Sequence, residues 1–160
     1  MQNKSVWRIS TAAARSVIAC GLIFAGSTAW ADDEIRCSNR TLLGDYGFHI
    51  EGVILAIPGM ILPPGGVPVR GVAMSHFDGK GNMTQVDHVV AGGNPPPQEW
   101  TFGSGPYKVN PNCTGTLTIN IPGSPFSPVK LHFVVVRQGK EIRTVVDSGS
   151  ATTSIGIKVE

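Results

Sequence analysis

The chain contains four histidines, a residue type that commonly binds metal ions: His49, His76, His88 and His132. Zinc requires ligand atoms about 2 Å from one point. A hairpin at 78–82 would pair His76 with Thr84 and Val72 with His88, so the two imidazoles of that hairpin would lie roughly 14 Å apart. Strand alternation turns the other two histidines outward. We therefore expect no metal site and no cofactor.

Carboxylates are the second group that could do chemistry. Paired acids, one acting as general acid and one as base or nucleophile, cleave glycosidic bonds. No partner is fixed for any acid here, so a solvated surface role is expected for each and no catalytic residue is assigned. The Gly-x-Ser-x-Gly, His-Glu-x-x-His and phosphate-loop motifs are absent from the sequence. The acids considered are Asp45, Glu51, Asp87, Glu99 and Asp147.

Apolar and aromatic side chains suggest a third kind of chemistry, the binding of a small hydrophobic molecule inside the fold. Aromatic rings beside a few polar groups form such a cavity when they line an interior, and they form an ordinary core when they fill it. The residues predicted to contact a ligand are Tyr46, Phe48, Met60, Leu62, Met74, His76, His88, Trp100 and Phe102.

The N-terminal residues predict where these groups are placed in the cell. Basic residues precede the short apolar run 16–25, and Ala29-Trp30-Ala31 follows it. This is the pattern of a signal peptide over residues 1–31, cleaved after Ala31, and it predicts a secreted or periplasmic protein. The apolar run is too short to span a bilayer, so we expect no integral membrane segment after cleavage. The remaining chain has the length of one domain.

The charge balance argues against nucleic acid as a partner. Three of the 13 Lys and Arg lie in the predicted signal peptide, which leaves 10 against 11 Asp and Glu. The remaining cations are scattered singly, whereas phosphate binding needs a basic face.

Two cysteines remain after Cys20 leaves with the signal peptide. In an oxidising compartment Cys37 and Cys113 are expected to form one disulfide. It would close a loop of roughly 75 residues and stabilise the fold by on the order of 3 to 5 kcal/mol. The segment 32–41 would thereby be tied to a distant turn.

The segment 42–160 alternates short apolar runs with Gly, Pro, Asn and Asp, which is typical of an all-β domain. Tight turns favour an antiparallel up-and-down β-barrel of about eight strands, whose closure leaves no free edge. A two-sheet β-sandwich is the alternative, but it needs long crossovers. Eight strands enclose room for packed side chains or for one small ligand. The expected strands are about 44–52, 69–77, 83–90, 100–109, 115–121, 129–137, 141–146 and a last one ending near 159.

The connection 55–68 is unusually apolar for a surface loop. Three roles are open for it. It could plug the end of the barrel, it could cover an apolar cavity as a lid, or it could form a patch for a partner.

The order of these motifs resembles a family of small exported bacterial proteins without assigned function. The resemblance rests on Cys37, the segments 43–48, 77–82 and 105–109, then 113–117 and 139–142. That family looks like lipocalin-type or allene-oxide-cyclase-type barrels, which implies an internal ligand. The resemblance assigns no catalytic residue to this chain.

Three functions are therefore compared. The leading hypothesis is an exported barrel that binds a small apolar ligand, or serves as a structural envelope component, without catalysis. The second is a cofactor-free isomerase or cyclase in which Tyr46, His76 or His88 polarises the substrate. The third is a surface interaction module that uses the proline-rich segments 62–65 and 94–97. A polar residue in an open apolar cavity would favour the second, and a filled interior would exclude it.

Overall fold

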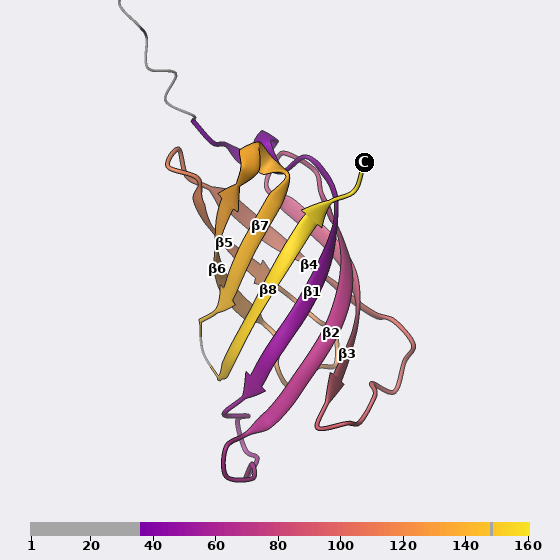
Figure 1. The fold of residues 1–160 in the computed structure, drawn as a ribbon. Helices are drawn as coiled ribbons and strands as arrows, with labels where there is room; N and C mark the ends of the chain where they lie inside the picture. Colours follow the sequence, from indigo (N-terminus) through magenta and orange to yellow (C-terminus); the bar gives the residue numbers. More distant parts are fainter. Residues whose placement is uncertain (1–35, 148) are drawn as a thin grey trace, which may run out of the picture. The chain divides into compact units, whose positions relative to one another are not determined.

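The computed structural model describes residues 36–147 and 149–160. The predicted signal peptide, 1–31, lies outside the described residues. Eight antiparallel strands form a closed barrel (Figure 1). The strands are β1 (Gly44–Ile54), β2 (Val67–Phe77), β3 (Asn82–Ala91), β4 (Thr101–Val109), β5 (Thr114–Ile119), β6 (Val129–Val136), β7 (Glu141–Val146) and β8 (Ser150–Lys158).

Each strand pairs with the next one in sequence, and β8 pairs with β1 to close the ring. This confirms the predicted all-β, up-and-down barrel and excludes the sandwich. The hairpin register predicted around 78–82 is also confirmed, because His76 lies opposite Thr84 and Val72 lies opposite His88.

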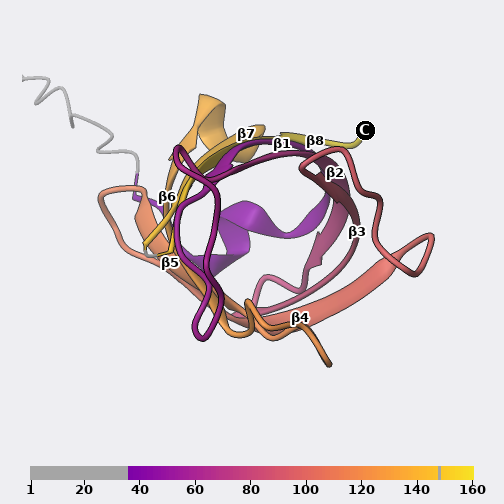
Figure 2. The ribbon, with the colours of Figure 1, turned by 90° about the horizontal axis from the view of Figure 1, so that it is seen from below.

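Alternating strand directions place the connections at two ends of the barrel. One end, the closed end, holds the turns after β2, β4 and β6 and the short helix η1 (Asn39–Leu42). The other end, the open end, holds the longer connections 55–66, 92–100 and 120–128 and the link from β7 to β8. Figure 2 views the barrel from the open end, with η1 behind the ring of strands.

The N-terminal segment 36–43 covers the closed end. Leu42 has no exposed surface and joins the core, and the Tyr107 hydroxyl donates a hydrogen bond to the Asn39 carbonyl at 3.0 Å. Cys37 and Cys113 form the predicted disulfide, with Cα atoms 4.9 Å apart and a sequence separation of 76. The sequence leaves open that the connection 55–68 plugs the barrel end, but the end that is closed is covered by the segment 36–43, and the connection lies at the opposite end.

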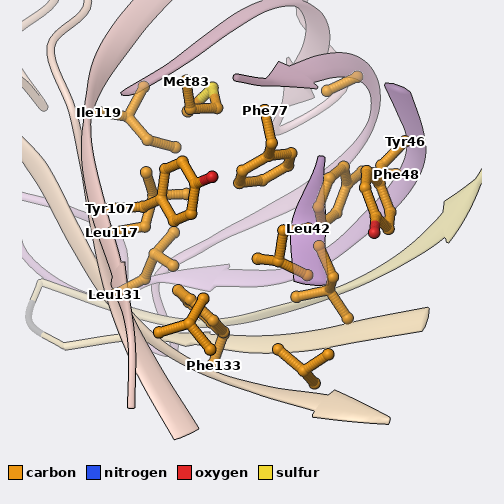
Figure 3. Packing of buried hydrophobic residues seen from close by; sticks show 14 of the residues in the cluster. Leu42, Tyr46, Phe48, Phe77, Met83, Tyr107, Leu117, Ile119, Leu131 and Phe133 are labelled. Carbon is orange, nitrogen blue, oxygen red and sulfur yellow. The ribbon is translucent and has the colours of Figure 1, made fainter. Parts of the chain in front are cut away.

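Aromatic side chains fill the closed half of the interior. The Phe77 ring meets Tyr46 edge-on with centroids 5.4 Å apart and meets Tyr107 edge-on at 5.0 Å. Figure 3 shows these rings projecting from their strands beside Leu42. Edge-to-face pairs of this kind add to the stabilisation that burial provides. Phe48 and Phe133 extend the same cluster toward the middle of the barrel.

Candidate functional site

The open half of the barrel contains a cavity of about 1170 Å³. Typical sites for small molecules have roughly 300–1,000 Å³, so this cavity can accommodate a large one. It exists because the inward side chains of the strands become smaller here. Aliphatic and small polar residues replace the rings of the closed half, and no strand in the described part of the chain contributes an aromatic side chain to the cavity wall. Its apolar wall includes Ile50, Val69, Val89, Ile121, Val129 and Leu131.

A polar cluster from β2 and β3 lies in this apolar interior. Gln85 Nε2 donates a hydrogen bond to Asp87 Oδ2 at 2.7 Å, and the Ser75 hydroxyl lies 3.5 Å from Gln85 Oε1. All three residues are buried, with 2%, 8% and 6% of the surface of Ser75, Gln85 and Asp87 exposed. Gln85 and Asp87 line the cavity. Because strand residues two apart share a face, β3 directs both side chains inward.

Gly103 on β4 makes room for this cluster. It is the register partner of Gln85, and a Cβ at this position would lie 3.2 Å from Gln85 Cγ and 2.9 Å from Ile119 Cγ2. Any larger residue would therefore push the amide of Gln85 away from β4. The glycine helps to set the position from which Gln85 holds Asp87.

The electrostatic environment of Asp87 is unusual for a carboxyl group. Burial raises the pKa of Asp87, while the hydrogen bond from Gln85 and the nearby His88 partly oppose that rise. Within 36–147 and 149–160, no lysine, arginine or histidine forms an ion pair with it. Such a group can act as an acid or base toward a cavity ligand, or it can pair with a charge that the ligand brings.

Hydroxyl groups supply the polar side of the opposite wall. Strands β3 and β7 are four apart in the ring of eight and therefore face each other. Thr144 on β7 and Ser154 on β8 hydrogen-bond through their hydroxyls at 2.7 Å, and both line the cavity. The cavity thus offers a carboxyl group on one side and neutral hydroxyls on the other.

None of the nine residues predicted to contact a ligand lines this cavity. Tyr46 and Phe48 belong to the filled half. Met60 and Leu62 lie in the connection from β1 to β2, with Met60 60% exposed. Of the remaining five, four lie on the outer face of the strands, and Trp100 lies exposed at the end of the connection 92–100; the four are Met74, His76, His88 and Phe102.

The structure corrects the expectation that these side chains line the interior, and alternation explains the outward placement of the four that lie on strands. Phe77 and Met83 are buried in the core, so Met74 and His76 on β2 and His88 on β3 have outward parity. His88 is half-buried and contacts Trp100 edge-on at 6.2 Å. Counting strand positions from Phe77 and Met83 would have identified Gln85 and Asp87 as the inward residues.

The apolar connection 55–66 contributes to the mouth of the cavity but does not fill the barrel. Ala56, Ile57 and Pro58 line the cavity, whereas Ile61 is fully exposed. Figure 2 shows this connection running across one side of the open end. Its position fits a partial cover over the cavity.

The other chemistry-bearing residues lie outside the cavity. His76 contacts Asp45 at 2.7 Å and His132 contacts Asp147 at 2.6 Å, both on the surface. The structure therefore separates Tyr46, His76 and His88, the groups proposed to polarise a substrate, from the cavity interior. Among the described residues, no group of three or more His, Cys, Asp or Glu could hold a metal ion. In the same part of the chain, no helix is long and apolar enough to cross a membrane.

Comparisons with known proteins add a structural likeness. No family model matches this chain, and no curated protein matches it. A solved structure of a redesigned β-barrel aligns with a TM-score of 0.46 and 12% sequence identity, covering 76% of this chain and 95% of that one.

Proposed function

We propose that this protein is an exported β-barrel that binds a small, largely apolar molecule in its open half. The observation that carries the proposal is the cavity of about 1170 Å³ between the aromatic core and the open end. Packed interiors contain few voids larger than a water molecule, so an opening of this size is typical of a binding site.

The chemistry of the wall favours an apolar ligand. A molecule that buries about 300 Å² of apolar surface gains roughly 7 kcal/mol from leaving water. The free-energy cost of association offsets part of that gain, so burial of this area supports a dissociation constant in the micromolar range or weaker. A ligand that buries more apolar area binds more tightly. The aliphatic wall supplies this driving force without a dedicated hydrogen bond at every position.

Export belongs to the same proposal. The predicted signal peptide, 1–31, directs the chain out of the cytoplasm, and the Cys37–Cys113 disulfide suits an oxidising compartment. A secreted or periplasmic carrier is consistent with the resemblance to lipocalin-type barrels. The alternative roles of structural envelope component and surface interaction module have less support, because they give the cavity no purpose.

A cofactor-free isomerase or cyclase is the second candidate, and one observation favours it. Asp87 is a buried carboxyl group beside the space that a substrate would occupy. A carboxyl group with a raised pKa can transfer protons near neutral pH. Asp87, rather than Tyr46, His76 or His88, would be the group in contact with the substrate.

Two measurements test the proposed function. Native mass spectrometry of the protein exported through an oxidising compartment should show an additional mass, and denaturing extraction should release an apolar compound. The purified protein should also take up a neutral apolar dye such as N-phenyl-1-naphthylamine. If it carries no compound and takes up no dye, the proposal fails.

A blocking variant locates the bound dye. Ile50→Trp places a large ring in the cavity wall and should weaken dye uptake, because Ile50 lines the cavity. Val72→Trp is the matched control, since Val72 is 50% exposed on the outer face of the neighbouring strand β2. Equal dye uptake by the two variants would contradict binding inside the barrel.

A further inference from the structure

We propose that the cavity selects an apolar molecule that carries one protonated amine, and that Asp87 is the group that recognises the ammonium. This inference rests on the proposed function and names the class of ligand. The amine would lie against β3, and the apolar part of the molecule would extend over the aliphatic wall toward the open end.

The first support is the geometry of the carboxyl group. Gln85 Nε2 donates a hydrogen bond to Asp87 Oδ2 at 2.7 Å, and this bond limits rotation of the Asp87 carboxyl group. In the described part of the chain no hydrogen bond reaches Oδ1 of Asp87, and this residue lines the cavity. Oδ1 is therefore the acceptor available to a ligand. A hydrogen-bond acceptor held in one position in an apolar wall orients the ligand and also increases its affinity.

The second support is the charge of the surroundings. The register partners of Asp87 are Ala73 on β2 and Thr101 on β4, and neither carries a charge. His88, its neighbour on β3, has the opposite parity, toward the outer face. Lys130 is the other charged residue among the described residues that line the cavity, and it is exposed at the rim. The interior therefore contains an acid without an internal cation.

Electrostatics then ranks the classes of ligand. A carboxylate in an apolar site is costly unless an opposite charge pairs with it. A protonated amine provides that pair in surroundings where charges attract strongly, because the effective dielectric constant is low. A neutral alcohol offers a hydrogen bond without the charge, and an anionic fatty acid meets like charge. The expected order of affinity is amine, then alcohol, then carboxylate.

Three probes with the same ten-carbon chain test this order: decylamine, decanol and decanoate. Alkylamines resemble lysine, whose pKa is about 10.4, so decylamine is protonated at pH 7. Displacement of N-phenyl-1-naphthylamine from the wild-type protein should show decylamine binding at least about tenfold more tightly than decanol. Decanoate should be the weakest. Decanol or decanoate binding as tightly as decylamine would overturn the inference.

Variants of the carboxyl group assign the preference to Asp87. Asp87→Asn should lower decylamine affinity by about tenfold or more and change decanol affinity by no more than about twofold. Asp45→Asn is the control, because it removes an acid from the exposed surface of β1. A preference for decylamine that survives in Asp87→Asn would overturn the assignment.

A second variant keeps the test independent of how well Asp87→Asn folds. Thr101→Lys places an ammonium group on the register partner of Asp87 and should abolish the preference for decylamine, because the internal cation replaces that of the ligand. Thr101→Met is its matched control without charge. Loss of the preference in both variants would count against charge pairing.

The probes also separate the two proposals. If the dye and all three probes fail to bind to the wild-type protein, the proposed function is wrong and this inference falls with it. If the dye and decanol bind without any preference for decylamine, binding in the barrel stands and only the ligand class assigned here is wrong.

Discussion

The ring of Phe48 occupies the space in which a side chain at Gly156 would lie. The two residues are register partners on β1 and β8, and a Cβ at Gly156 would be 2.4 Å from Phe48 Cε1. Phe133 on β6 and Gly115 on β5 repeat the arrangement, with a closest approach of 2.2 Å. Each glycine thus leaves room for the aromatic ring of the neighbouring strand to pack against its backbone. These two rings help to complete the core below the cavity.

Gly156→Ala should therefore destabilise the fold. The added methyl group must displace the Phe48 ring, and overpacking of this kind costs about 1–3 kcal/mol. Urea unfolding of the purified protein measures the change. Gly47→Ala is the control, because Gly47 is on the outer side of β1 and a Cβ there meets no atom within 4 Å. Equal losses in both variants would contradict the role given to the Phe48 ring.

Removing either cysteine should lower stability by the same amount. Cys37→Ser and Cys113→Ser each abolish the one disulfide between them, and the double variant should be no less stable than either single one. The expected loss is about 3–5 kcal/mol, since the bond closes a loop with a sequence separation of 76. Thermal or urea unfolding gives the free energies. A free-thiol titre in the exported wild-type protein would contradict the prediction.

Much of the barrel could be predicted from sequence because turns and alternation are local properties. Asp78 shows how: its carboxylate accepts a hydrogen bond from the Asn82 side chain and others from the backbone of Asn82, Lys80 and Gly81. These contacts hold the pKa of Asp78 well below the usual range. That turn fixes the register of β2 with β3. On β6, Leu131 and Phe133 are buried as their alternation predicts.

The cavity could not be predicted in the same way, because the usual rule reverses on β3. Gln85 and Asp87 point inward while Val86 between them is 39% exposed, so the polar residues are inside and the apolar one is outside. A pattern search for an apolar inner face therefore chooses the wrong side. Whether the interior is filled depends on the total volume of the inward side chains of all eight strands. No short segment of the sequence contains that information.

Tyr46→Phe should destabilise the closed end of the barrel. The buried Tyr46 hydroxyl donates a hydrogen bond to the carbonyl of Gly139, and the variant leaves that carbonyl without this donor. The expected cost is about 1–2 kcal/mol. The fall should appear in urea unfolding at pH 7. An unchanged midpoint would show that water replaces the hydroxyl without loss.

The same hydroxyl predicts how stability changes in alkali. Burial, with a smaller contribution from Tyr107, raises the pKa of Tyr46 from 10.0 to about 12. The unfolded chain therefore loses this proton first, and the stability that Tyr46 contributes declines as pH rises above 10. In Tyr107→Phe, which removes the smaller of the two causes, absorbance of the remaining tyrosine should show ionisation well above pH 10 or together with unfolding. Ionisation near pH 10 in a folded protein would contradict this.

Asp87→Asn should make the protein more stable at neutral pH. Burial raises the pKa of Asp87, so between the unfolded-state and folded-state values the folded protein binds more protons than the unfolded chain. Stability consequently falls as pH rises from about 3.8 through the folded-state pKa. Asparagine retains an acceptor for Gln85 without the charge. The gain at pH 7 should be on the order of 1 kcal/mol.

The pH dependence of this gain distinguishes a buried charge from a simple packing effect. The difference in melting temperature between Asp87→Asn and the wild type should shrink as pH is lowered through the folded-state pKa and then below 3.8, because the wild-type carboxyl group then becomes neutral in both states. A constant difference at all pH values would assign the effect to packing. A variant less stable than the wild type at pH 7 would mean that Asp87 stabilises the barrel, and a carboxyl group that stabilises its fold needs no ligand to explain its presence. A stabilising substitution that also removes amine binding would instead identify Asp87 as a residue that costs stability and serves function.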